Sequence, residues 1–112
     1  TADLNTFLFY SKIKLFFNRN GFKVVSFRKK KNANGPDCYI KSGDSVFTCE
    51  IKSCKITERG TVQVYPVEPN RRNDDFILIE LPSGYLMFSK MKDHISLCTK
   101  SGYRSLWNVG ST

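Results

Sequence analysis

Apolar and polar positions alternate with a helical period over the first part of the chain. Between residues 3 and 19 the apolar side chains recur every three or four positions. Asp3 or Asn5 can cap the start, and Asn20-Gly21 ends the pattern. The spacing predicts an amphipathic helix over residues 3–19 that packs on a sheet, with Lys12, Lys14 and Arg19 toward solvent. Its recurring apolar residues are Leu4, Phe7, Leu8, Ile13, Leu15, Phe16 and Phe17. The phenylalanines of this helix and Tyr10 are predicted to be core rather than a base-stacking platform.

A period of two replaces the helical period after this segment. Residues 22–27 have the valines and aromatics of a strand, and a turn-rich loop over 28–36 follows. Residues 37–41 and 46–52 then predict a hairpin. If Gly43-Asp44 forms its two-residue turn, facing residues have numbers that add up to 87.

This register divides the hairpin into two different faces. One face is wholly apolar and contains Cys38, Ile40, Phe47, Cys49 and Ile51. The other face contains Asp37, Tyr39, Thr48, Glu50 and Lys52, and on it Asp37 lies directly opposite Glu50.

The following part of the chain leaves one alternative open. Residues 61–65 alternate like a strand, yet residues 56–64 could equally form a short helix. A loop over 66–75 precedes residues 76–81, which are apolar enough for a buried central strand, and residues 85–88 predict its hairpin partner.

Near the C-terminus, residues 89–98 resemble a short helix with Met91, Ile95 and Leu97 partly inward. His94 on this helix is expected to be a surface or capping histidine. The tail from Thr99 is expected to be a loop anchored by Tyr103 and Trp107.

Length and composition favour one compact domain over residues 1–112, because a chain of 112 residues with 40% hydrophobic residues can bury one core. No segment has the length of a membrane span or the pattern of a signal peptide. Four cysteines and one histidine show no zinc-binding spacing. A reduced, cytoplasmic protein is expected, with no disulfide between the facing Cys38 and Cys49.

The net charge of +8 is concentrated at one end. Residues 1–35 hold eight Lys or Arg against one acid, giving +7, whereas residues 36–112 hold ten against nine. Such an excess attracts phosphate backbones or anionic lipid heads. A basic balance that serves only solubility is the alternative.

The facing Asp37 and Glu50 point to metal chemistry. Two carboxylates with Cβ atoms roughly 5 Å apart can hold one hard divalent cation, and Mg²⁺ is the natural occupant, with Mn²⁺ as a substitute. Lys52, on the same strand face as Glu50, could orient a water or stabilise charge on a phosphate. The backbone carbonyl of Ile51 is a further candidate metal ligand.

Pro36-Asp37, followed after 12 residues by Glu50-Ile51-Lys52, resembles the motif of the PD-(D/E)xK nuclease superfamily, which includes restriction enzymes and resolvases. The order of elements over residues 3–88 is similar to the αβββαβ core of that family, an α/β fold with a mixed central sheet flanked by helices. The resemblance implies metal ligation by Asp37 and Glu50, assistance by Lys52, and cleavage of DNA to leave a 5′-phosphate. It also makes Gln63 a candidate site residue, while the first helix offers only Asp3 as a further acid.

These residues predict a Mg²⁺-dependent endonuclease for DNA, acting as a homodimer because so small a domain offers limited surface. A junction-resolvase-like enzyme or a small phage or mobile-element nuclease fits the size. Arg28, Lys29, Lys30 and Lys31 are expected to hold the phosphate backbone, whereas Arg71 and Arg72 could equally pair with Asp74 and Asp75.

Three alternatives remain open. The charged hairpin residues could form only an exposed cross-strand salt bridge. The chain could instead be an inactive nucleic-acid-binding module on the same fold, or a protein-interaction domain.

Overall fold

Helix α1 (Leu4–Arg19) forms where the helical period predicts it. The computed structural model describes residues 4–28, 35–56, 58, 61–64, 73–100 and 107–111. Gly21 ends the helix in the left-handed region at φ 84°, and the amides of Asn20 and Phe22 both donate to the carbonyl of Phe17, at 3.0 and 2.9 Å. The chain thereby reverses toward the first strand.

A five-stranded mixed sheet forms the centre of the molecule. Its strands lie in the order β1-β2-β3-β6-β7, in which β3 and β6 run parallel and all other neighbours run antiparallel. The bounds are β1 (Lys23–Phe27), β2 (Cys38–Ser42), β3 (Ser45–Ser53), β6 (Phe76–Glu80) and β7 (Leu86–Lys90). The predicted α/β class with a mixed sheet between helices is confirmed, as are the motif hairpin and the buried strand with its hairpin partner.

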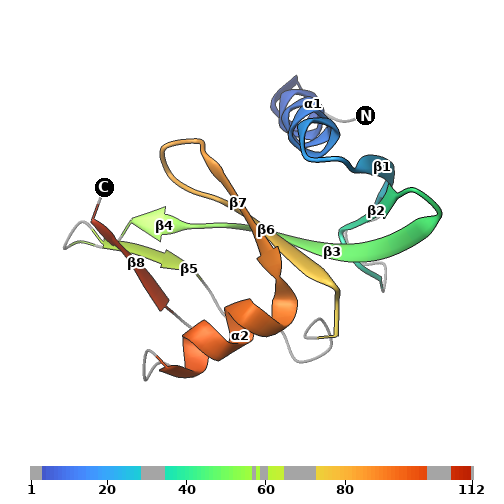
Figure 1. Ribbon diagram of the computed structural model, residues 1–112. Coiled ribbons are helices and arrows are strands. Elements are labelled where there is room, and N and C mark those ends of the chain that lie inside the picture. Colours follow the sequence, from blue (N-terminus) through green and yellow to red (C-terminus); the bar gives the residue numbers. More distant parts are fainter. Residues whose placement is uncertain are drawn as a thin grey trace.

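The two helices cover opposite faces of this sheet (Figure 1). Ile13 and Phe17 of α1 pack on the apolar hairpin face and on Leu78. Helix α2 (Met91–Lys100) packs against β6 and β7, with Met91 buried on Ile77 and Ile79. In the described part of the chain, no helix is long and apolar enough to cross a membrane.

Only part of the expected core of α1 is buried. Ile13 and Phe17 have no exposed surface, and Phe16 packs beside them. Four apolar side chains that were expected in the core lie on the outer side of the helix with half or more of their surface exposed: Leu4, Phe7, Leu8 and Leu15. Only one side of a helix can contact the sheet, so the apolar side chains on its other sides remain exposed.

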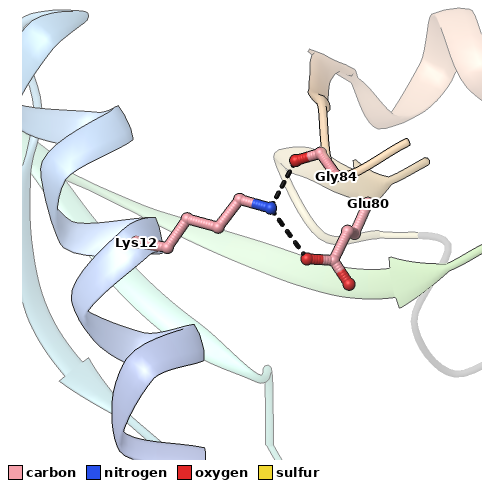
Figure 2. Close-up of polar contacts among 3 residues, drawn as sticks. All are labelled: Lys12, Glu80 and Gly84. Carbon is pink, nitrogen blue, oxygen red and sulfur yellow. Dashed lines mark hydrogen bonds and ion pairs between the residues drawn. The ribbon is translucent and has the colours of Figure 1, made fainter. Parts of the chain in front are cut away.

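Lys12 contacts the end of β6 and the turn that follows it instead of pointing to solvent. Its ammonium group forms an ion pair with Glu80 at 3.0 Å and donates a hydrogen bond to the carbonyl of Gly84 (Figure 2). The prediction of a solvent-directed Lys12 was wrong because β6 and its following turn pass within reach of α1, while Lys14 and Arg19 are exposed as expected.

A second, three-stranded sheet settles the alternative left open for residues 56–64. It contains β4 (Lys55–Ile56), β5 (Thr61–Val64) and β8 (Trp107–Ser111) in the order β4-β5-β8, so the strand reading is right. β8 pairs antiparallel with β5, and the expected loop was therefore wrong for residues 107–111. Figure 1 shows this sheet away from α1, at the far end of β3.

Helix α2 begins two residues later than predicted, because Ser89 and Lys90 complete β7. Met91 is buried and Ile95 half-buried, as expected. The helix that covers the second face of the sheet thus follows β7, and the described residues between β3 and β6 include the strands β4 and β5.

Candidate active site

The predicted hairpin register places Asp37 beside Glu50. Cys38 pairs with Cys49 and Ser42 with Ser45, so facing numbers add up to 87 along β2 and β3. Asp37 immediately precedes β2, and its Oδ2 accepts a hydrogen bond from the Ile51 amide at 2.8 Å. Asp37 therefore lies next to Glu50 at the end of the hairpin away from its turn.

Arg28 holds Asp37 from the other side. The Arg28 amide donates to the Asp37 carbonyl at 2.8 Å, and the guanidinium Nη2 lies 2.9 Å from Asp37 Oδ1. Only 17% of the Asp37 side chain is exposed. Both oxygens of this carboxylate are thus oriented by the protein, and each keeps a second lone pair for a further partner.

Glu50 is a buried carboxyl group, with 7% of the residue exposed. Burial and the neighbouring Asp37 carboxylate raise the pKa of Glu50 to about 8, and Asp74 adds to the shift while Lys52 opposes it. Like charges at such a position destabilise each other. The arrangement therefore favours either a proton on Glu50 or a cation between the two carboxylates.

Lys52 and His94 complete the same region from β3 and α2. Lys52 is half-buried on the sheet face that α2 partly covers. His94 is 1% exposed, so the expectation of a surface or capping histidine was wrong. Burial and the nearby Lys52 ammonium lower the pKa of His94. The spacing of His94 from Met91 and Ile95 on one helix face could have indicated its burial.

Asp74 and Asp75 are site neighbours that the sequence did not identify. Asp74 is 9% exposed, and its charge acts on Glu50. The Asp75 carboxylate accepts hydrogen bonds from the amide and hydroxyl of Thr48, at 2.9 and 3.3 Å, and the Asp75 amide donates to Thr48 Oγ1 at 3.0 Å. These bonds lie at the start of the parallel pairing of β3 with β6, directly before Cys49 and Phe76. This long-range contact cannot be predicted from a local sequence pattern.

The other candidate residues lie either in the second sheet or outside the described residues. Gln63 lies on β5 in the second sheet, opposite Lys55 and Asn108, and its side chain lies outside the described residues. The candidate phosphate contacts Lys29, Lys30, Lys31, Arg71 and Arg72 also lie outside them.

The donor atoms suit a hard divalent cation. Within the described residues, no group of three or more His, Cys, Asp or Glu side chains is arranged to hold a metal. Mg²⁺ in proteins, however, is often bound by one or two carboxylates and retains several waters. The amide and carbonyl of one strand residue point to the same side. The Ile51 carbonyl is therefore directed to the side of β3 on which Asp37 lies, and it could add a third oxygen.

Comparison with known proteins supports the fold. No protein-family model and no curated protein sequence matches this chain. Among solved structures, the chain is similar to the bacterial homing endonuclease I-Ssp6803I, with a TM-score of 0.71 and 13% sequence identity. The match covers 100% of this chain and 78% of the endonuclease. The chain thus shares its fold with a bacterial homing endonuclease.

Proposed function

We propose that this protein is a metal-dependent endonuclease that hydrolyses DNA phosphodiester bonds. The observation that carries the proposal is the pairing of Asp37 with the buried Glu50, beside Lys52, at the end of the β2–β3 hairpin. A fold shared with a homing endonuclease supports it, as does the resemblance of Pro36-Asp37 and Glu50-Ile51-Lys52 to the PD-(D/E)xK motif.

Asp37, Glu50 and the Ile51 carbonyl would hold the cation, Mg²⁺ or Mn²⁺. When bound, the cation would lower the pKa of an attacking water and neutralise charge on the phosphate. The Ile51 amide keeps Asp37 oriented toward Glu50. Burial keeps bulk water from Glu50, which strengthens its attraction to a cation.

Lys52 and Arg28 supply positive charge on either side of the carboxylate pair. Lys52 lies two residues beyond Glu50 on the same strand face, where its ammonium can hold a phosphate oxygen or orient a water. Arg28 fixes Asp37 through its ion pair. With 34% of its side chain exposed, Arg28 can also contact the DNA backbone.

Nicking of supercoiled plasmid in Mg²⁺ or Mn²⁺ tests this function. Asp37→Asn retains an oxygen for the Ile51 amide and Lys52→Gln retains most of the side-chain length, so both should fold and both should lower the rate by about 100-fold or more. The matched controls Asp44→Asn, in the exposed hairpin turn, and Lys90→Gln, exposed at the end of β7, should nick like the native chain. Undiminished nicking by Asp37→Asn would refute the mechanism.

An inactive DNA-binding module on the same fold is the second candidate. The ion pair between Arg28 and Asp37 favours it, because a guanidinium can neutralise the aspartate in place of a metal. If the native chain binds DNA in a salt-dependent manner but never nicks it in either cation, this second function is correct.

Two finer properties belong to the same proposal. We infer that the substrate is defined by its structure, as for a junction resolvase, or by a mobile-element target site. We also infer a homodimer, because one small domain covers little duplex. Cleavage of a four-way junction compared with linear duplex, and the mass in solution by light scattering, would decide these points.

A further inference from the structure

Among the described residues, a helix covers only one half of the sheet face that carries the candidate site. α2 packs over β6 and β7, whereas the same face of β1, β2 and β3 exposes several side chains. We call this half the open sheet surface. It contains Lys23, Tyr39, Lys41 and Val46, which are all exposed, Tyr39 to 40% and Val46 to 56%.

Two lysines face each other on the open sheet surface. Lys23 of β1 is the direct cross-strand partner of Lys41 of β2. Like charges at directly opposed positions destabilise a sheet. In the part of the chain that the structure describes, neither lysine forms an ion pair with an acid. The repulsion between the two ammonium groups would be relieved by an anion bound across both.

This lysine pair is aligned with the candidate site along one strand. Asp37, Tyr39 and Lys41 occupy alternate positions and therefore share a face. Lys41 lies four residues of extended chain beyond Asp37, a distance of about 14 Å at roughly 3.4 Å per residue. One strand of duplex DNA advances about 3.4 Å per nucleotide, so the span matches about four nucleotides.

We propose that the open sheet surface is a DNA-docking surface on which Lys23 and Lys41 together bind the phosphate backbone about four nucleotides from the cut bond. The inference rests on the proposed function, since it takes Asp37 as the position of cleavage. Tyr39, between the lysines and the site, can donate its hydroxyl to an intervening phosphate. Contacts of this kind set the position of the substrate without reading its sequence.

Salt-dependent binding tests the surface independently of cleavage. Binding of a short fluorescein-labelled DNA duplex is measured by anisotropy without divalent ions, for the native chain and for the double variant Lys23→Gln/Lys41→Gln. The matched control, Lys14→Gln/Arg19→Gln, removes the same charge from exposed positions on α1, which packs on the opposite face of the sheet.

Loss of two phosphate contacts should reduce the slope of log affinity against log salt by about 1.8. The ratio of native to variant affinity should consequently shrink about tenfold between roughly 50 and 200 mM salt. The control should keep the native slope. A native slope in Lys23→Gln/Lys41→Gln would overturn the inference and leave Lys23 as protection of the edge strand β1 against pairing with other chains.

The two proposals fail in different ways. Plasmid nicking by the native chain together with an unchanged slope in Lys23→Gln/Lys41→Gln overturns the docking surface alone. A reduced slope without nicking overturns the nuclease function and its cut site, while the lysine pair is retained as a DNA contact. Absence of duplex binding by the native chain overturns both.

Discussion

At the scale of single residues, Glu50 links pH to stability. Its pKa rises from 4.5 to about 8 on folding, first through burial and then through Asp37. The folded state thus binds the proton more tightly than the unfolded state does. The stabilisation is complete below pH 4.5 and is lost as the pH rises through about 8.

Glu50→Gln should therefore flatten the fall in stability between about pH 5 and 8 in a chelating buffer, since the amide does not ionise. Thermal unfolding across this range measures the effect. Asp44→Asn, exposed in the hairpin turn, should keep the native pH profile. A Glu50→Gln profile as steep as that of the native chain would show that another group carries the dependence.

Some residues of the candidate site could be placed from the sequence, and others could not. Asp37 and Glu50 could be placed together because one turn fixes the register of a hairpin, and alternation then fixes every face. Asp74 and His94 could not be placed in the site from the sequence. Their positions near Glu50 and Lys52 depend on how β6 and α2 pack against β3.

At the scale of elements, the polar contacts of Lys12 hold α1 to the turn after β6. The side chains of Lys12 and Glu80 are 39% and 28% exposed, so their ion pair is partly screened by water. Gly84 adopts φ 93° and offers its carbonyl to the same ammonium group. The helix is thus joined to the sheet by polar contacts as well as by its apolar side.

Lys12→Met should keep the apolar stem of the side chain while removing both contacts, and should lower the free energy of unfolding by about 1 kcal/mol. Urea unfolding monitored by circular dichroism measures the change. Lys14→Met provides a control at an exposed position of the same helix. Equal stability of the two variants would mean that the Lys12 contacts add nothing measurable.

The elements themselves were predictable to different degrees. α1 and the motif hairpin follow from strong local periods, and β6 follows from a continuous apolar run. β8 does not, because Asn108 and Gly110 are poor strand formers and the strand owes its form to pairing with β5. For residues 56–64 a short apolar pattern fits helix and strand alike, and only the neighbouring strands decide between them.

At the scale of the whole molecule, cation binding should stabilise the fold. The proposed cation would occupy the folded state alone, because Asp37 and Glu50 come together through the β2–β3 pairing. At about 100 times the Kd, Mg²⁺ should add about 2.7 kcal/mol and raise the Tm by about 10 °C.

Differential scanning fluorimetry with and without Mg²⁺ measures this shift. Asp37→Asn should lose most of it, while Asp44→Asn should show the native shift. Since the proposed cation would compete with the proton on Glu50, the shift should also grow as the pH rises toward 8. A Tm of the native chain that Mg²⁺ leaves unchanged at pH 8 would argue against cation binding by this pair.

The bonds between Thr48 and Asp75 have a consequence for the order of folding. These residues are 27 positions apart, whereas β2 with β3, and β6 with β7, are joined by short turns. Loop closure costs more entropy for distant segments. We expect the two hairpins to form first and to dock later along β3 and β6. Glu50, whose strand neighbour in β6 is Ile77, then becomes buried only in this last step, so the pH dependence of its carboxyl should appear in the docking rate.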